Sequence, residues 1–295
     1  MIKDFIKNNY IEYISDVSLK EYNTYHIDSK ALGMVFPKSI EELVNILKYF
    51  KENNIEYVFL GNGSNIILKD EYYNKIFIKL DKLNNYKIED NIVTVEAGVP
   101  LIRLSLDCAR LGLSGLEFMC ALPGHMGSSV AMNAGAYNQS ISDVLVSAKI
   151  LTKDLELKEF TNSDLDFKYR DSFLKHNRDY ICLEATLKLK HGDSKEIYEV
   201  MAKRQSKRIE SQPLEYPCAG SVFRNPDGLY AGELIEKCEL KGTNINGAEV
   251  SLKHANFIIN KGNAKGKDII ELIELIKKKV YDKYGVELVL EQEII

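Results

Sequence analysis

The stretch Ile55-Glu56-Tyr57-Val58-Phe59-Leu60-Gly61-Asn62-Gly63-Ser64-Asn65 joins an apolar run to a glycine turn. The apolar run is typical of a buried strand, and two further β-like runs follow between residues 66 and 80. Before it, Ile40 to Asn53 spaces its apolar side chains as a helix does, and Ser39 with Glu42 forms a capping box at the helix start. This alternation of helix and strands predicts a small α+β unit.

Two more units are expected downstream. Ile92 to Ala97 alternates like a strand, and Leu101 to Leu111 is helical up to Gly112, a residue typical of helix ends. A second α+β unit therefore begins near residue 85, and a third begins near residues 190 to 200. The other expected elements are the strands Val144 to Leu151, Ile181 to Leu189, Phe257 to Ile259 and Val286 to Leu290, and the helices Lys195 to Ile209, Leu229 to Cys238 and Lys267 to Tyr284.

Composition excludes several classes of protein. The 295 residues carry 39 Lys and Arg against 43 Asp and Glu, so the chain lacks the basic footprint that nucleic-acid binding needs. The five cysteines are scattered, without a Cys-x-x-Cys pair, which indicates a reducing compartment and no metal site. No run reaches membrane-spanning length, and the first ten residues lack a signal-peptide core. We expect a soluble cytoplasmic protein without membrane or nucleic-acid partners.

Two clusters of small residues are candidates for a ligand site. In Gly61-Asn62-Gly63-Ser64-Asn65 successive backbone N–H groups can form an anion-binding nest, although a hairpin turn is the simpler interpretation of this run alone. The run is neither a P-loop nor a dinucleotide fingerprint, since Gly-Lys-Ser/Thr is missing and Ile66 stands at the third glycine position. A second cluster spans Leu122 to Tyr137, and two such loops converging on one ligand suit a dinucleotide.

Three isolated polar residues are candidates for catalysis. Arg170 offers a guanidinium that can hold a carboxylate through two hydrogen bonds, or it forms a surface ion pair. Ser221 lies in the irregular, proline-flanked run Gln212 to Pro226, so its hydroxyl is either presented to a ligand or part of a tight turn. Glu291 follows the expected strand Val286 to Leu290, and it either faces a cleft or belongs to a charged tail.

Taken together and in this order, these runs resemble the family of UDP-N-acetylenolpyruvoylglucosamine reductases, flavoenzymes of bacterial peptidoglycan synthesis. The resemblance extends from about Tyr22 to the C-terminus, in the shorter form of the family that lacks an inserted tyrosine-bearing loop. The runs that carry it are Asn23-Thr24-Tyr25, Leu60-Gly61-Asn62-Gly63-Ser64-Asn65, Gly115-Leu116-Glu117-Phe118, Pro123-Gly124, Met132-Asn133-Ala134-Gly135-Ala136-Tyr137, Tyr169-Arg170-Asp171-Ser172, Gln212-Pro213-Leu214-Glu215-Tyr216-Pro217, Ala219-Gly220-Ser221-Val222-Phe223, Lys253-His254-Ala255 and Glu291.

The resemblance implies an α+β fold of the vanillyl-alcohol-oxidase (PCMH) type, in which two α+β subdomains bind FAD noncovalently and a C-terminal α+β domain covers the substrate. The expected division is an N-terminal segment 1–25, an FAD-binding domain 26–190 with subdomains of about 26–84 and 85–190, and a substrate-binding domain 196–295. It also implies that NADPH reduces the flavin and that hydride then passes from flavin N5 to the vinyl carbon of the enolpyruvyl sugar nucleotide. A monomer or weak homo-oligomer is expected.

The family's catalytic positions match Arg170, Ser221 and Glu291. Hydride addition places negative charge on the carbon that bears the carboxylate. The resemblance therefore assigns Arg170 to stabilising that charge and Ser221 to protonating that carbon. It assigns Glu291 either to orienting the substrate carboxylate or to acting as an acid with a raised pKa. The expected FAD contacts are Gly61, Asn62, Gly63, Ser64, Asn65, Pro123, Gly124, His125, Gly127, Ser128, Asn133, Gly135 and Ala136, and the expected substrate contacts are Tyr137, Arg224 and Asn225.

Several positions depart from the family pattern. Asp28-Ser29 replaces Gly-Gly, His125 and Ser128-Ser129 replace a small hydroxyl residue and a glycine-rich pair, Glu233 replaces a lysine, and Gln292-Glu293 replaces Val-Arg or Val-Lys. These changes leave FAD affinity and turnover open. Two alternatives therefore stand beside the reductase: an oxidase of the same fold with flavin attached covalently at His125, and a catalytically silent paralogue that binds the sugar nucleotide.

Overall fold

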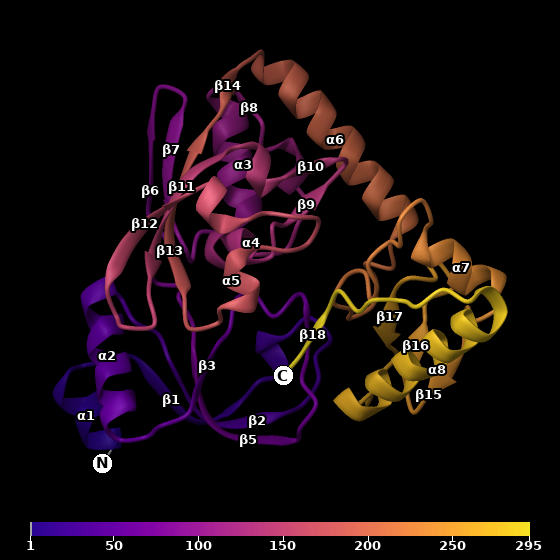
Figure 1. The fold of residues 1–295 in the computed structure, drawn as a ribbon, viewed down its shortest axis with the longest axis horizontal. Coiled ribbons are helices and arrows are strands. Elements are labelled where there is room, and N and C mark those ends of the chain that lie inside the picture. The colour runs from indigo at the N-terminus through magenta and orange to yellow at the C-terminus, as the bar shows by residue number, and fades with distance from the viewer. Residues whose placement is uncertain (1) are drawn as a thin grey trace. The chain divides into compact units, whose positions relative to one another are not determined.

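The computed structural model describes residues 2–295, which divide into two compact units (Figure 1). The first unit comprises the chain up to Ser15, Gly33–Gly61 and Lys75–Ser206; the second comprises Asp16–Leu32, Asn62–Asn74 and Lys207–Ile295. Elements that give residues to both units are β1 (Tyr13–Ser18), β2 (Lys30–Val35), β5 (Tyr72–Ile78) and α6 (Ser194–Ser211). The domain boundaries expected from the sequence stay a prediction.

A four-stranded sheet with the order β1-β2-β5-β3 is packed by the amphipathic helix α2 (Ile40–Glu52). Strand β3 (Tyr57–Phe59) pairs in parallel with β5, and α1 (Ile2–Asn8) precedes the sheet. The buried core contains Leu43, Ile46, Leu47 and Phe50 of α2 with Val35, Ile76 and Ile78 of the strands. The predicted cap is present, since the Ser39 hydroxyl accepts from the Glu42 N–H at 3.1 Å, although the Glu42 carboxylate accepts from the Lys38 N–H.

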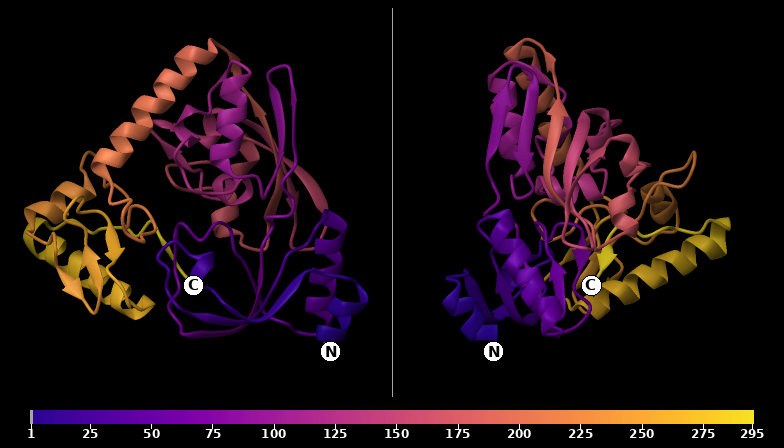
Figure 2. Two further views of the ribbon diagram at one scale, coloured as in Figure 1. Left: turned by 180° about the vertical axis from the view of Figure 1, so that it is seen from behind. Right: turned by 60° about the vertical axis from the view of Figure 1, so that its left-hand side comes forward.

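A five-stranded antiparallel sheet forms the rest of the first unit, and Figure 2 shows it from two further sides. Its strand order is β12 (Leu157–Thr161), β11 (Leu145–Leu151), β13 (Ile181–Lys188), β7 (Ile92–Glu96) and β6 (Tyr86–Glu89). Helices α3 (Leu101–Arg110) and α4 (Met126–Ala131) bury apolar side chains in the same core as β7 and β13. Smaller elements are β8 (Leu113–Ser114) with β14 (Lys190–His191), β9 (Gly135–Ala136) with β10 (Gln139–Ser140), and α5 (Phe173–His176).

Gly127 sets how closely α4 packs on this sheet. A Cβ atom at this position would lie 2.7 Å from the Ala97 side chain and 2.9 Å from the Cys182 carbonyl oxygen. Only glycine permits that approach. Gly127 therefore has a role in helix–sheet packing, and its expected contact with FAD stays a prediction.

The second unit packs α8 (Gly266–Tyr284) on a three-stranded antiparallel sheet, with α7 (Ala231–Lys237) beside the helix. The strands are β15 (Asn244–Ile245), β16 (Ala248–Val250) and β17 (Ile258–Asn260). The α8 helix ends at Gly285, whose left-handed backbone (φ +65°) allows its N–H to bond the Tyr281 carbonyl. The unit also contains a parallel pair of short strands, β4 (Ile66–Ile67) and β18 (Glu293–Ile294).

Most predicted elements are present within one to three residues of the expected ends, but two expectations are wrong. Val286 to Leu290 is not a strand, since Leu290 makes a single antiparallel bridge to Phe223. The glycine run after Leu60 is not a hairpin turn either. The strands that flank it belong to different sheets, because β3 pairs with β5 and β4 pairs with β18.

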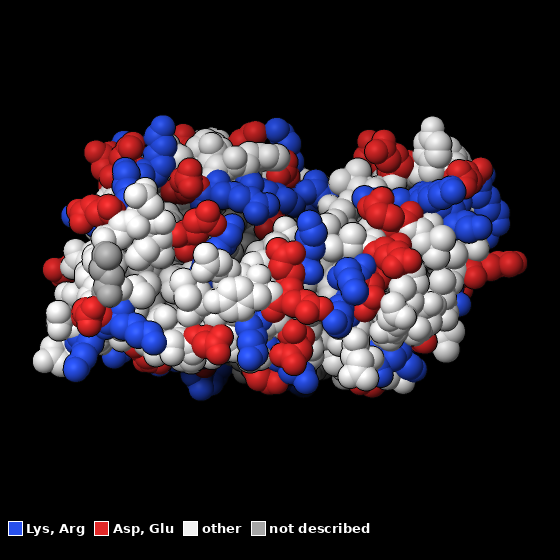
Figure 3. Space-filling view, turned by 90° about the horizontal axis from the view of Figure 1, so that it is seen from below, with Lys and Arg blue, Asp and Glu red and all other residues white. Residues whose placement is uncertain are grey.

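Charge is mixed on the face that Figure 3 shows, where basic and acidic side chains are scattered among uncharged surface. This agrees with the near balance of 39 basic and 43 acidic residues. Within residues 2–295, every helix is too short or too polar to span a lipid bilayer.

Candidate functional site

Two of the predicted glycine loops lie against each other in the first unit. A Cβ atom added to Gly61 would lie 2.8 Å from the Ser128 Oγ and 2.9 Å from the Ser128 Cβ. Ser128 is held there because its hydroxyl donates to the His125 carbonyl at 3.0 Å, and the Ser129 hydroxyl donates to the same oxygen at 2.8 Å. The Gly61 loop after β3 therefore packs directly on the Ser128 side chain of α4.

A charged cluster supports the same two loops. The Lys79 ammonium, only 5% exposed, donates to the Gly61 carbonyl at 2.7 Å and lies 3.3 Å from the Asp81 carboxylate. The Asp81 carboxylate also lies 3.5 Å from the His125 Nδ1. Burial lowers the pKa of His125, partly offset by Asp81, and burial lowers the pKa of Lys79 as well.

Tyr137 stands at the tip of a tight hairpin between β9 and β10. Tyr137 and Asn138 both have positive φ values, +56° and +57°, which is the pattern of a type I′ turn. An aromatic residue is uncommon at the first central position of such a turn. The Tyr137 ring is 42% exposed, its hydroxyl donates to the Arg204 carbonyl at 2.8 Å, and the Arg204 guanidinium lies 4.9 Å from the ring centre. The hairpin thus presents an aromatic ring paired with a cation.

Arg170 lies in a second tight turn, closed by reciprocal backbone bonds between Lys168 and Asp171 at 3.1 Å. It has a left-handed backbone (φ +55°), and its guanidinium donates to the Gly135 carbonyl. The turn is anchored by Asn133, whose amide donates to the Lys168 carbonyl at 2.9 Å and accepts from the Ser142 N–H at 3.1 Å. Asn133, expected as an FAD contact, therefore uses both polar ends of its amide on the protein backbone.

The remaining part of the first glycine loop, Asn62 to Asn65, belongs to the second unit. A Cβ atom at Gly63 would lie 2.1 Å from the Tyr22 carbonyl, and the Gly63 carbonyl accepts from the Thr24 N–H at 3.0 Å. The Asn65 amide donates to the Glu291 carbonyl at 3.2 Å. This half of the loop therefore contacts the segment that carries one of the predicted catalytic residues.

Ser221 and Glu291 are brought together by backbone pairing within the second unit. The Glu291 N–H donates to the Val222 carbonyl at 2.8 Å, and the Arg224 N–H donates to the Val289 carbonyl at 2.9 Å. These bonds enclose the bridge between Phe223 and Leu290. Both predicted catalytic residues are half-buried on neighbouring segments, whereas Arg170 belongs to the first unit.

Asn256 holds the Ser221 segment through hydrogen bonds on the edge opposite the Glu291 segment. Its side-chain amide accepts from the Phe223 N–H at 3.0 Å and donates to the Phe223 carbonyl at 2.8 Å, while its own carbonyl accepts from the Val222 N–H. Of the predicted substrate contacts here, Asn225 accepts from the Ala231 N–H at the start of α7, and Arg224 is half-buried.

Sequence reasoning missed Lys79, Asp81, Asn256 and Gln292 as supports of these segments. Lys79, the one lysine in the otherwise apolar run Ile76 to Leu80, is the signal that indicates a buried ammonium. Gln292 was visible only as a departure from the family pattern.

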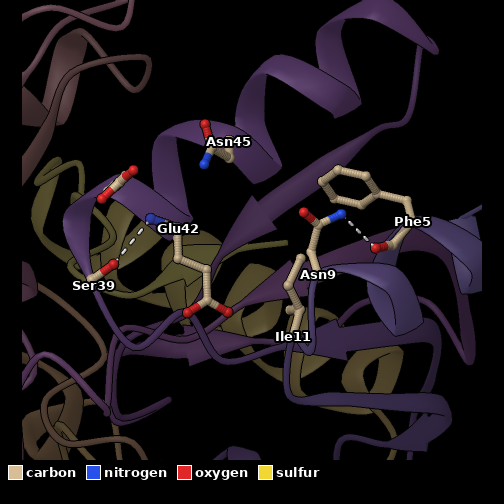
Figure 4. A pocket seen from close by; sticks show the side chains of 7 residues that line it. Phe5, Asn9, Ile11, Ser39, Glu42 and Asn45 are labelled. Atoms are coloured by element: carbon tan, nitrogen blue, oxygen red, sulfur yellow. Dashed lines mark hydrogen bonds between the residues drawn. The ribbon is translucent and has the colours of Figure 1, made fainter.

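The residues of the first unit fit an FAD molecule. Gly61 has no side chain to cover its backbone N–H, as the close approach of a pyrophosphate requires. A separate pocket of about 260 Å³ lies between α1 and α2 and is lined by Phe5, Asn9, Ile11, Ser39, Glu41, Glu42 and Asn45 (Figure 4). Its lining includes none of the residues predicted to bind cofactor or substrate.

The fold and the two sequence models that match the chain define an FAD-binding oxidoreductase. A sequence model described as "FAD binding domain" matches residues 31–161, and one described as "UDP-N-acetylenolpyruvoylglucosamine reductase, C-terminal domain" matches residues 212–295. The chain belongs to the UDP-N-acetylenolpyruvoylglucosamine reductase family. The predicted α+β fold of the vanillyl-alcohol-oxidase type is confirmed.

Full-length relatives support this assignment. The chain is 44% identical to the UDP-N-acetylenolpyruvoylglucosamine reductase of Clostridium tetani, over 97% of this chain and 94% of that protein. It is 42% identical to the reductase of Caldicellulosiruptor bescii, over 98% of this chain and 92% of that protein. The crystal structure of the reductase from Thermus caldophilus, 33% identical, superposes with a TM-score of 0.81 over 96% of this chain and 98% of that one.

Proposed function

We propose that this protein reduces the enolpyruvyl group of UDP-N-acetylenolpyruvoylglucosamine to give UDP-N-acetylmuramate, with noncovalent FAD and with NADPH as the electron source. The observation that carries the proposal is the near full-length identity of 42% to 44% with reductases of that name. The pairing of the Ser221 and Glu291 segments supports it, because the two residues lie far apart in the sequence and on adjacent backbone in the fold.

The reaction adds two electrons and two hydrogens across a carbon–carbon double bond. FAD, when bound and reduced by NADPH, would supply the hydride for the vinyl carbon, and NADPH would leave as NADP. The α-carbon then carries negative charge delocalised into its carboxylate and needs one proton. The protein must therefore stabilise an enolate and deliver a proton to a single carbon.

We assign enolate stabilisation to Arg170, whose guanidinium can pair with a carboxylate in two parallel hydrogen bonds. The left-handed backbone at this position supports a functional role, since such conformations are uncommon for arginine and gather at functional sites. Ser221 donates its hydroxyl proton to the α-carbon and recovers a proton from solvent. Glu291 orients the substrate carboxylate or acts as an acid beside it.

Gly61, Gly124 and Ser128 are proposed to hold the FAD pyrophosphate, with Lys79 providing positive charge nearby and the neutral His125 imidazole a hydrogen bond. The Asp81 contact and the burial of His125 favour a noncovalent role for the imidazole over attachment to the flavin. Tyr137 and Arg224 are proposed as substrate contacts. The five free cysteines suit a reducing cytoplasm, where both sugar nucleotide and NADPH occur.

The test separates the two half-reactions. The purified protein is expected to be yellow, to bleach with NADPH and to regain its colour when the enolpyruvyl sugar nucleotide is added. Acid precipitation should release the flavin into the supernatant, and flavin retained in the pellet would indicate the covalent oxidase. A protein that binds the sugar nucleotide but leaves the reduced flavin bleached would indicate the silent paralogue.

Ser221→Ala should still be bleached by NADPH. Its rate of reoxidation by the substrate should fall by a factor of about 10² or more, a typical loss for a positioned proton donor. Cys218→Ser, a change in the same loop, is the matched control and should keep both half-reactions. If Ser221→Ala is reoxidised at the rate of the unmodified protein, the proton donor is a different group.

A further inference from the structure

Gln292, the residue after Glu291, is buried while both of its neighbours are half-exposed. Its side chain is 3% exposed, and its amide forms three hydrogen bonds. The amide nitrogen donates to the Ala219 carbonyl at 3.0 Å and to the Gly220 carbonyl at 3.3 Å, and the amide oxygen accepts from the Tyr25 hydroxyl at 3.0 Å. One side chain therefore connects the glutamate segment to the loop that carries the serine.

Tyr25 provides the fixed point of this connection. It is fully buried, and burial raises the pKa of its hydroxyl, so the phenol remains a neutral donor. The Tyr25 carbonyl accepts from the Asn260 amide at 2.8 Å, and the Asn260 N–H donates to the Pro217 carbonyl at 2.9 Å. The serine loop is thus tied to Tyr25 at Pro217 through Asn260 and at Gly220 through Gln292.

These bonds fix both peptide planes that flank Ser221. The Gly220 carbonyl belongs to the peptide that enters Ser221, so the bond from Gln292 orients that plane. The peptide that leaves Ser221 is held by the Val222 N–H, which donates to the Asn256 carbonyl at 2.9 Å. Gly220 itself has φ +74° and open space around its missing Cβ, so it supplies conformation and no packing.

We propose that Gln292, held by Tyr25, is a positioning residue for proton delivery by Ser221. The inference rests on the proposed function, since it concerns the protonation half of that reaction. A hydroxyl is a weak acid, and its reactivity depends on a position held to within a fraction of an ångström of the carbon that takes the proton. Gln292 acts on that position because it couples the loop before Ser221 to the segment of Glu291.

The experiment measures the two half-reactions of the FAD-loaded protein by stopped-flow absorbance. Gln292→Met keeps the side-chain length and removes all three hydrogen bonds. We expect its flavin reduction by NADPH to stay within twofold of the unmodified protein and its reoxidation by the enolpyruvyl sugar nucleotide to slow at least tenfold. The solvent deuterium isotope effect on reoxidation should increase, because proton transfer then limits the rate. Tyr25→Phe removes only one of the three hydrogen bonds. It should slow reoxidation by about threefold, a rate between those of the unmodified protein and Gln292→Met.

Asp268→Ala is the control for lost stability. Asp268 is a buried side chain of the same unit that accepts from the Lys265 N–H and the Asn246 amide at the start of α8. It should leave the rates and the isotope effect of both half-reactions unchanged. If both Gln292→Met and Tyr25→Phe are reoxidised at rates within twofold of the unmodified protein, the inference fails while the proposed function stands. The same holds if both half-reactions slow equally. If the unmodified protein is not reoxidised by the sugar nucleotide, the proposed function fails and the inference with it.

Discussion

Replacing Gly61 by alanine should destabilise the FAD-free protein, because the added methyl group has no space beside Ser128. It would lie 2.8 Å from the Ser128 Oγ and 2.9 Å from its Cβ, well inside van der Waals contact. Inserting one methyl group into a closely packed contact costs about 1 to 3 kcal/mol. Displacing Ser128 also breaks its hydrogen bond to the His125 carbonyl, worth about 1 kcal/mol.

We therefore expect Gly61→Ala to lower the free energy of unfolding by about 2 to 4 kcal/mol. Urea unfolding followed by circular dichroism measures the change. Gly192→Ala is the matched control, since a Cβ atom there meets its nearest neighbour at an ordinary 3.5 Å. A double-mutant cycle with Ser128→Gly isolates the clash from the cost of glycine in a helix. Equal stability of Gly61→Ala and Gly192→Ala would refute the contact between the two loops.

Two further changes test the supports of the site. Asn256→Ala should lower the free energy of unfolding by about 2 to 4 kcal/mol, because it leaves the buried N–H and carbonyl of Phe223 unpaired; unchanged urea midpoints would contradict this. Since burial lowers the pKa of folded His125, the unfolded state binds more protons as the pH falls below about 6.5, and stability should fall with it. His125→Ser should reduce that loss between pH 7.5 and 5.5, measured by urea midpoints, and parallel curves for the two proteins would count against it.

Local signals explain the elements that the sequence predicts well. The α2 helix has both an apolar stripe and a serine cap within a dozen residues, and the structure has it at Ile40–Glu52. Strand pairing is different, because the partner of a strand is chosen by tertiary contacts. Nothing in the run Gly61 to Asn65 indicates that β4 pairs with β18, more than two hundred residues away, instead of folding back on β3.

In the candidate site, too, some features are visible in the local sequence and others depend on tertiary contacts. A hydroxyl after glycine between prolines is visible in the sequence, and the structure shows Ser221 half-buried in an irregular segment. The sequence shows Gln292 only as a departure from the family pattern, because its three hydrogen-bond partners, Tyr25, Ala219 and Gly220, lie far away along the chain. Its burial depends on segments that no sequence window contains together.

The three-part composition of the second unit has a consequence for protein engineering. The sequence model of the C-terminal domain begins at residue 212, yet a gene fragment cut there would omit Tyr25 and Asn65. Gln292 and Asn260 would then keep buried amides whose partners had been left on the other fragment. Chimeras that exchange this region between homologues must therefore carry the matching N-terminal stretches, or they will transplant the proposed catalytic residues without the groups that hold them.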